Sequence, residues 1–162
     1  MLFMPPRSGK SELVSRRLPA YVLGKNPNAR VMACSHTAQL AGRMNRDVQR
    51  IIDSNSYAQL FPGSRLPQKG KRGLRTNAAF DLFDRKDSYV CAGIGGPITG
   101  LGFDFGIIDD PIKNAEEAYS VTIRENVWEW YTTTFYTRQQ KNARILITLT
   151  RWHPDDLAGR LC

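Results

Sequence analysis

The sequence predicts an α/β protein with a central, mostly parallel β-sheet flanked by helices. Short apolar runs alternate along the chain with longer amphipathic stretches, which is the pattern of strands joined by crossover helices. The chain has 162 residues, of which 41% are hydrophobic, so it can bury one core without disulfides or metal. We therefore expect a single domain over residues 1–162.

Strands are expected where apolar residues run together between turn signals. The segments with this pattern are 1–4, 30–34, 103–108 and 144–150. Residues 76–84 and 88–92 are candidates for two further strands, although the sequence leaves their pairing open. Residues 93–102 are rich in glycine and are expected to form a loop.

Helices are expected where apolar residues recur at helical spacing. One begins near Gly9 and is interrupted by Pro19, because proline removes a backbone donor within a helix. A second covers about 37–53, and a long third helix is expected over about 115–140. The last residues, 155–162, look like the start of another helix.

Composition restricts the function classes. The three cysteines form neither a close pair nor an even set, which argues against a disulfide framework or a zinc ribbon. The net charge of +8 favours a polyanionic partner such as nucleic acid. No stretch approaches the roughly 18 continuous apolar residues of a membrane span, so we expect no membrane partner.

A candidate phosphate-binding loop, PPRSGKS, occupies residues 5–11 between an apolar strand and a helix. Backbone amides around Ser8 and Gly9 would hold phosphates, Lys10 would neutralise their charge, and the Ser11 hydroxyl would bind Mg²⁺. Met4 stands where the usual motif has its first glycine. The alternative is an ordinary helix start that binds no ligand.

Paired acids end the apolar strand near residue 108. In a phosphate-binding protein, Asp109 would hold Mg²⁺ largely through water, and Asp110 would orient or deprotonate an attacking water. The alternative is a turn that caps the next helix. That alternative weakens once a phosphate loop precedes the acids in the chain.

The strand over 144–150 completes the sheet of a P-loop NTPase of the additional-strand type. Thr148 and Thr150 lie toward its C-terminal end, where ligands bind in open parallel sheets, so either hydroxyl could sense a γ-phosphate. The alternative is that threonine, being β-branched, simply suits a strand.

Three segments together resemble the ATPase domain of phage large terminase subunits. They are PPRSGKSEL, GGPITGLGFDFGIIDDPIKNAEEA and ILITLTRWHPDDLAGRL, in this order and over nearly the whole chain. The resemblance implies an additional-strand P-loop fold, ATP and Mg²⁺ as ligands, and ATP hydrolysis coupled to translocation of double-stranded viral DNA into the procapsid. It matches Lys10 and Ser11 to the phosphate and metal residues, and Asp109 to the metal acid.

Asp110 stands where the family commonly has glutamate, and its shorter side chain leaves the catalytic assignment somewhat open. Thr148 and Thr150 match the family's coupling motif only in type and position. Arg7 is a candidate to stabilise transition-state charge in cis. The candidates for an arginine acting in trans are Arg124, Arg138 and Arg151, among which the sequence does not choose.

The resemblance also sets the expected partners and scope. The partners are the procapsid portal, the small terminase subunit and other copies of the chain in a ring, in the host cytoplasm during phage assembly. We expect the domain to be truncated at both ends, with the adenine-binding segment and the nuclease domain outside it, so DNA cutting is not assigned to this chain.

A basic, glycine-spaced stretch is the candidate DNA contact. Lys69, Lys71, Arg72 and Arg75 could follow DNA phosphates without reading bases, or could simply form a solvated loop. Two other functions remain alternatives to packaging: a helicase-like DNA translocase, and a catalytically inactive DNA-binding fragment of the same fold.

Overall fold

The computed structural model describes residues 1–68 and 73–162. Within these residues lies a six-stranded sheet of β1 (Leu2–Phe3), β2 (Val31–Ser35), β3 (Ala79–Phe80), β4 (Tyr89–Gly93), β5 (Phe103–Asp109) and β6 (Gln139–Leu149). The α-helices are α1 (Leu18–Lys25), α2 (Ala38–Ile52), α3 (Asn55–Leu60), α4 (Ala115–Tyr119), α5 (Val121–Glu129) and α6 (Leu157–Leu161). The π-helical segments η1 (Glu12–Arg17) and η2 (Trp130–Phe135) and the 3-10 segment η3 (Tyr136–Arg138) adjoin them.

The strands follow the order β1-β6-β5-β2-β4-β3, and every pairing is parallel except that of β3 with β4. The last strand of the chain, β6, therefore lies between β1, which leads into the phosphate loop, and β5, which ends in the paired acids. This order confirms the predicted additional-strand P-loop fold. It also brings the C-terminal ends of β5 and β6 to the same edge of the sheet as the loop.

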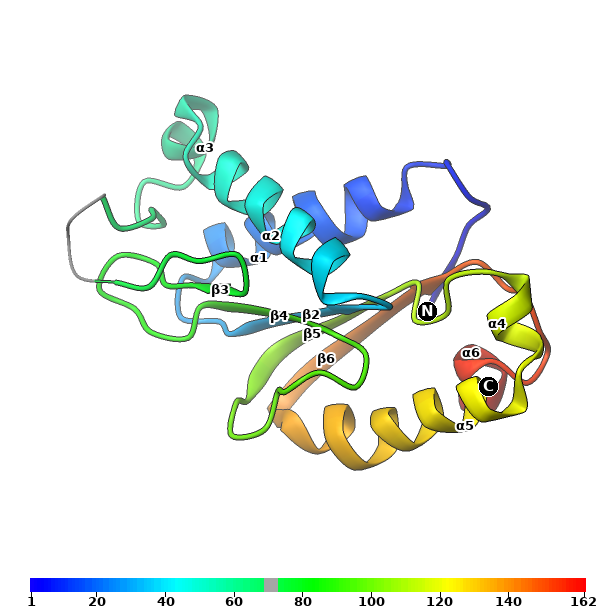
Figure 1. Ribbon diagram of the computed structural model, residues 1–162. Helices are drawn as coiled ribbons and strands as arrows, with labels where there is room; N and C mark the ends of the chain where they lie inside the picture. The colour runs from blue at the N-terminus through cyan, green and yellow to red at the C-terminus, as the bar shows by residue number, and fades with distance from the viewer. Residues whose placement is uncertain (69–72) are drawn as a thin grey trace.

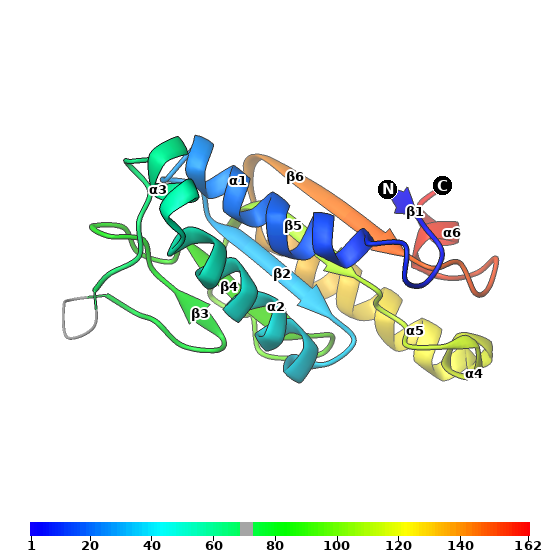
Figure 2. The same cartoon turned by 90° about the horizontal axis from the view of Figure 1, so that it is seen from above.

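Helices cover both faces of the sheet (Figure 1). One face of the sheet is covered by η1, α1 and α2, and the other face is covered by α5 and η2. The view from above shows the same arrangement (Figure 2). Because side chains alternate along a strand, each buried strand contributes to both cores. Thus Ala33 and Ile107 belong to the core beneath α2, whereas Cys34 and Ile108 belong to the core above α5.

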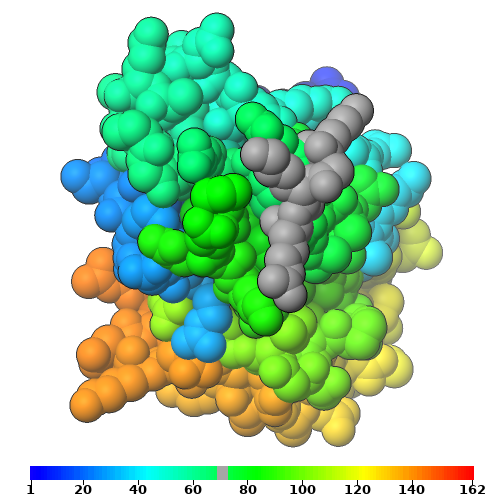
Figure 3. Space-filling model, turned by 90° about the vertical axis from the view of Figure 1, so that its left-hand side faces the viewer, coloured from blue at the N-terminus to red at the C-terminus, as the bar shows by residue number. Residues whose placement is uncertain are grey.

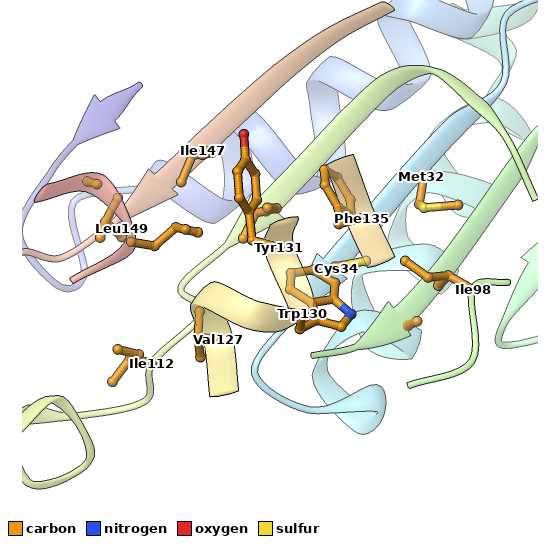
Figure 4. Close-up of a cluster of buried hydrophobic side chains, with 14 of the residues drawn as sticks. Met32, Cys34, Ile98, Ile112, Val127, Trp130, Tyr131, Phe135, Ile147 and Leu149 are labelled. Carbon is orange, nitrogen blue, oxygen red and sulfur yellow. The ribbon is translucent and has the colours of Figure 1, made fainter. Parts of the chain in front are cut away.

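The core on the α5 side is rich in aromatic side chains. Trp130, Tyr131 and Phe135 from η2 pack against the underside of the sheet, as Figure 4 shows. The ring centroids of Trp130 and Phe135 lie 5.3 Å apart, and Phe103 of β5 lies 4.9 Å from Phe135. These contacts hold η2 against β5 and so fix the direction from which β6 enters the sheet.

The prediction of one long helix over 115–140 is wrong, because Ser120 interrupts it between α4 and α5. This residue has an extended conformation (φ −73°, ψ 114°), and its side chain accepts a hydrogen bond from the Ile123 amide, which caps α5. Serine competes well for this position because its hydroxyl replaces a missing backbone partner. The helix then passes into η2 and η3, and β6 begins at Gln139, earlier than expected.

Three other expectations also change. The strand predicted over 76–84 is shorter in the structure, where only Ala79–Phe80 forms a strand. This strand runs antiparallel to β4. Residues 55–60, for which the sequence predicted neither a helix nor a strand, form α3. Pro19 does not interrupt the first helix, because the chain stays helical through it, π-helical to Arg17 and α-helical from Leu18.

Figure 3 shows the face formed by α3, the segment around β3 and the start of β6. Among the described residues, none of the helices combines the length and the apolar character needed to cross a membrane.

Candidate active site

The candidate site lies where the loop after β1 meets the C-terminal ends of β5 and β6. Parallel pairing places Thr148 of β6 beside both Leu2 of β1 and Asp109 of β5. In an open parallel sheet, this edge is where the fold presents its ligand-binding groups. The order of the strands therefore brings the three predicted elements of the site together.

The phosphate loop turns sharply before η1. Arg7 and Gly9 both have positive φ values, 61° and 84°, and a Cβ atom on Gly9 would meet no atom within 4 Å. Gly9 is thus required by its backbone conformation and not by a close neighbour. Arg7 and Ser8 are exposed, and the Ser8 hydroxyl donates to the Pro5 carbonyl at 2.7 Å.

Lys10 is buried, with 5% of its surface exposed, and its ammonium group has two partners. It donates to Asp110 Oδ1 at 2.6 Å and to Thr150 Oγ1 at 2.7 Å. The structure thus joins the lysine of the phosphate loop, the second acid of β5 and the threonine after β6 in one cluster. A buried cation needs such partners, because desolvation of an unpaired ammonium is costly.

Asp110 is held by the backbone as well. Its φ is 45°, a left-handed conformation that aspartate adopts more readily than longer side chains. Its amide donates to the Thr148 carbonyl at 2.9 Å, and its Oδ1 accepts the Thr150 amide at 3.0 Å. Any movement of this carboxylate would therefore act directly on the end of β6.

Asp109 lies deeper than Asp110 and is 1% exposed. Its Oδ2 accepts a 2.6 Å hydrogen bond from Ser15 in η1, while its Oδ1 has no hydrogen-bond partner among the described residues. Burial raises the pKa of this carboxyl, an effect that the hydrogen bond from Ser15 and the nearby Ser11 hydroxyl oppose. The Ser11 side chain makes no capping hydrogen bond at the start of η1.

Sequence reasoning missed Ser15 and Ser35. Ser15 is fully buried because the π-helical geometry of η1 turns it toward Asp109, and apolar spacing does not reveal a π-helix. Ser35 ends β2 beside Asp109 in the sheet. Ser35 and Asp109 share one sequence signal, because each is a polar residue at the end of an apolar strand.

The candidate arginines occupy different environments. Arg124 is 8% exposed, contacts Asp155 at 3.1 Å and donates to the Ala118 carbonyl at 2.6 Å. Arg151 pairs with Asp156 at 2.8 Å. Among the described residues, the Arg138 guanidinium hydrogen-bonds only to the Thr137 hydroxyl.

The basic stretch proposed to contact DNA is only partly described. Lys69, Lys71 and Arg72 lie outside the described residues. Arg75 is described, and its guanidinium group pairs with Asp53 and donates to Gln49 Oε1 at 3.0 Å. These contacts occupy much of the hydrogen-bonding capacity of Arg75.

Comparison with known proteins identifies the family. A model of the family described as "Terminase large subunit, T4likevirus-type, N-terminal" matches residues 1–160. The chain belongs to the large terminase family. No curated protein matches it.

Among solved structures, the terminase chain resembles the ATPase domain of the large terminase of Thermus phage P74-26, with a TM-score of 0.52 and 22% identity. The match covers 92% of this chain and 58% of that structure. At this level of identity the likeness shows the fold, which agrees with the strand order described above.

The terminase site has the donor groups that Mg²⁺ and a triphosphate require. No group of three or more His, Cys, Asp or Glu side chains that could hold a metal occurs among residues 1–68 and 73–162. Mg²⁺ commonly binds through one or two carboxylates, with phosphates and water completing its shell. Asp109 Oδ1, which accepts no hydrogen bond from the described residues, and the Ser11 hydroxyl, which makes no capping hydrogen bond, suit this way of binding Mg²⁺.

Proposed function

We propose that this chain is the ATP-hydrolysing motor domain of a large terminase, which moves double-stranded viral DNA into a procapsid. The observation that carries the proposal is the contact of Lys10 with both Asp110 and Thr150. It joins a phosphate-binding cation, an acid suited to act on water, and a strand end that can respond to the reaction.

Each residue has a role in the proposed reaction. Ser8, Gly9 and Lys10 bind the phosphates of ATP, while Ser11 and Asp109 hold Mg²⁺, which supplies positive charge against the phosphate oxygens. Asp110 orients the attacking water and accepts its proton. Thr148 and Thr150 sense the γ-phosphate, and the exposed Arg7 stabilises transition-state charge.

The contacts of Asp110 support a coupling route from hydrolysis to movement. Binding of the phosphates withdraws Lys10 from Asp110, which leaves the carboxylate with the Thr150 amide as its partner. The end of β6 is then free to shift as Asp110 changes its contacts. The partners proposed for this movement are duplex DNA, the procapsid portal, the small terminase subunit and other copies of the chain in a ring.

Phosphate release from ATP, with and without duplex DNA, tests the proposal. Lys10→Ala should lose both nucleotide affinity and turnover, because it removes the buried cation. Asp110→Asn should lower turnover about 10²–10⁴-fold. Its nucleotide affinity should stay equal to wild type or increase, because Lys10 no longer has an anionic competitor for the phosphates.

Two exposed residues provide matched controls. Lys25→Ala removes a cation at the end of α1, and Asp84→Asn changes an aspartate that also has a positive φ, 58°. Both should keep wild-type turnover. Equal background release by wild type, Lys10→Ala and Asp110→Asn would contradict the catalytic role and favour the inactive DNA-binding alternative.

A further inference from the structure

Three neighbouring strands each place an oxygen-bearing side chain at the same level of the sheet. Ser35 of β2 is in register with Asp109 of β5, and Asp109 is in register with Thr148 of β6. Neighbouring strands lie about 4.8 Å apart, and residues in register point to the same face. These three side chains form a polar row on the face that also carries η1.

Each residue of the polar row is buried and has an unused oxygen. Ser35, Asp109 and Thr148 are 1%, 1% and 0% exposed. Among the described residues, Ser35 Oγ, Asp109 Oδ1 and Thr148 Oγ1 have no hydrogen-bond partner. Buried polar atoms in proteins nearly always have one.

Other buried serines in the chain do have partners. Ser64 and Ser88 are each 1% exposed, as Ser35 is. The Ser64 hydroxyl lies 3.1 Å from the Tyr57 hydroxyl, and Ser88 Oγ accepts the Leu82 amide at 2.9 Å. Ser35 therefore differs from these other buried serines of the described chain.

The chemistry of the polar row suits the water shell of a cation. The central group is a carboxylate, which repels a phosphate oxygen but accepts hydrogen bonds from water. The Ser15 hydroxyl occupies Asp109 Oδ2 at 2.6 Å, so Oδ1 remains for a further ligand. The hydroxyls on either side can each accept from water bound to the same cation.

We propose that Ser35 is a positioning residue of the magnesium site, where its hydroxyl, with Asp109 Oδ1 and Thr148 Oγ1, binds water molecules coordinated to the cation. This inference rests on the proposed function, because it requires a cation bound with nucleotide. Ser35 acts through water and does not touch the reacting phosphate. Mutation of a residue that contacts a metal's ligands, and not the metal itself, usually lowers the affinity for the metal about 10–100-fold.

The test compares Ser35→Ala with Ser64→Ala by two measurements. The first is Mn²⁺ affinity in the presence of a non-hydrolysable ATP analogue, followed by electron paramagnetic resonance of free Mn²⁺. The second is the unfolding temperature of the ligand-free protein. Ser35→Ala should weaken Mn²⁺ binding about tenfold while the unfolding temperature stays the same or rises.

Ser64→Ala should show the opposite pattern, since its hydroxyl has a protein partner: a lower unfolding temperature and wild-type Mn²⁺ affinity. Wild-type Mn²⁺ affinity in Ser35→Ala would overturn the inference and leave the proposed function intact. A wild-type protein that binds no Mn²⁺ with the analogue would overturn both.

Discussion

At the scale of single residues, opposite charges in the candidate site are paired with each other. Lys10 is buried against Asp110, so the cation meant for phosphates is already paired with the acid proposed to act on water. This arrangement avoids an unpaired buried charge before nucleotide binds. In the proposed function, the phosphates of the nucleotide would compete with Asp110 for the same ammonium group.

The raised pKa of Asp109 predicts that the stability of the protein without nucleotide depends on pH. Burial raises its pKa above the ordinary value of 3.8, so the folded state favours the protonated form. The stability from this preference is present below pH 3.8 and is lost as the pH rises through the folded-state pKa. Asp109→Asn, which cannot ionise, should therefore unfold at a higher temperature than wild type at pH 7.

Thermal unfolding measured from neutral to acidic pH checks this expectation. The advantage of Asp109→Asn should shrink as the pH falls and wild-type Asp109 takes up its proton. The same variant should lose Mn²⁺ affinity, because the amide carries no charge. An Asp109→Asn protein less stable than wild type at pH 7 would show that the carboxylate stabilises the ligand-free fold.

At the scale of elements, the sequence predicted those whose pattern depends only on burial. The strands β2, β4 and β5 are apolar runs, and α2 has one apolar face, so ordinary periodicity locates them. The segments η1 and η2 have π-helical hydrogen bonds, which apolar spacing does not distinguish from α-helical ones. The break at Ser120 depends on one side-chain hydrogen bond that competes with an otherwise helical pattern.

The packing of η2 on β5 predicts a specific cost at Gly106. A Cβ atom there would lie 2.7 Å from Phe103 Cε2 and 2.8 Å from Phe135 Cζ, closer than packed atoms allow. Gly106→Ala should therefore lower the free energy of unfolding by about 1–3 kcal/mol, the usual cost of overpacking a core. Chemical denaturation measures the difference.

Gly63→Ala is the matched control, because a Cβ atom at Gly63 would meet nothing within 4 Å. It should leave the free energy of unfolding close to that of wild type. Equal stability of the two variants would mean that the rings of Phe103 and Phe135 move aside without cost.

At the scale of the whole molecule, the order of the strands decides which distant residues become neighbours in the candidate site. Lys10, Asp109 and Asp110 could be proposed as site residues from the sequence because each belongs to a motif that is local in the chain. Ser35 also closes a buried strand, but its place beside Asp109 could not be predicted, because it follows from the pairing of β2 with β5, and these strands are far apart in sequence. Chain order alone does not say which strands become neighbours.

A network of ion pairs joins α5 to the segment that follows β6. Asp155 contacts Arg124 and Arg160 at 3.1 Å and 2.8 Å, and Arg160 also pairs with Glu125 at 2.6 Å. Hydrogen bonding by Arg160, and then by Arg124, lowers the pKa of Asp155. A lowered carboxyl pKa stabilises the fold above the unfolded value of 3.8, and this contribution is lost as the pH falls further.

Asp155→Asn should therefore lower the unfolding temperature at pH 7, and the difference from wild type should narrow once the pH falls below 3.8. Because Asp155 is exposed to solvent, added salt should also reduce the difference. Asp84→Asn, at an exposed site that has no ion pair among residues 1–68 and 73–162, serves as the control. A difference that stays constant with pH would contradict the role of the charge.

The pairing of β1 with β6 has a consequence for how the protein is made. Leu2 lies beside Thr148, so β1 pairs with a strand that the ribosome synthesises much later than β1 itself. Contacts between such distant segments form slowly, because a long loop must first be closed. The proposed nucleotide binding should thus appear only after β6 has emerged from the ribosome and paired with β1.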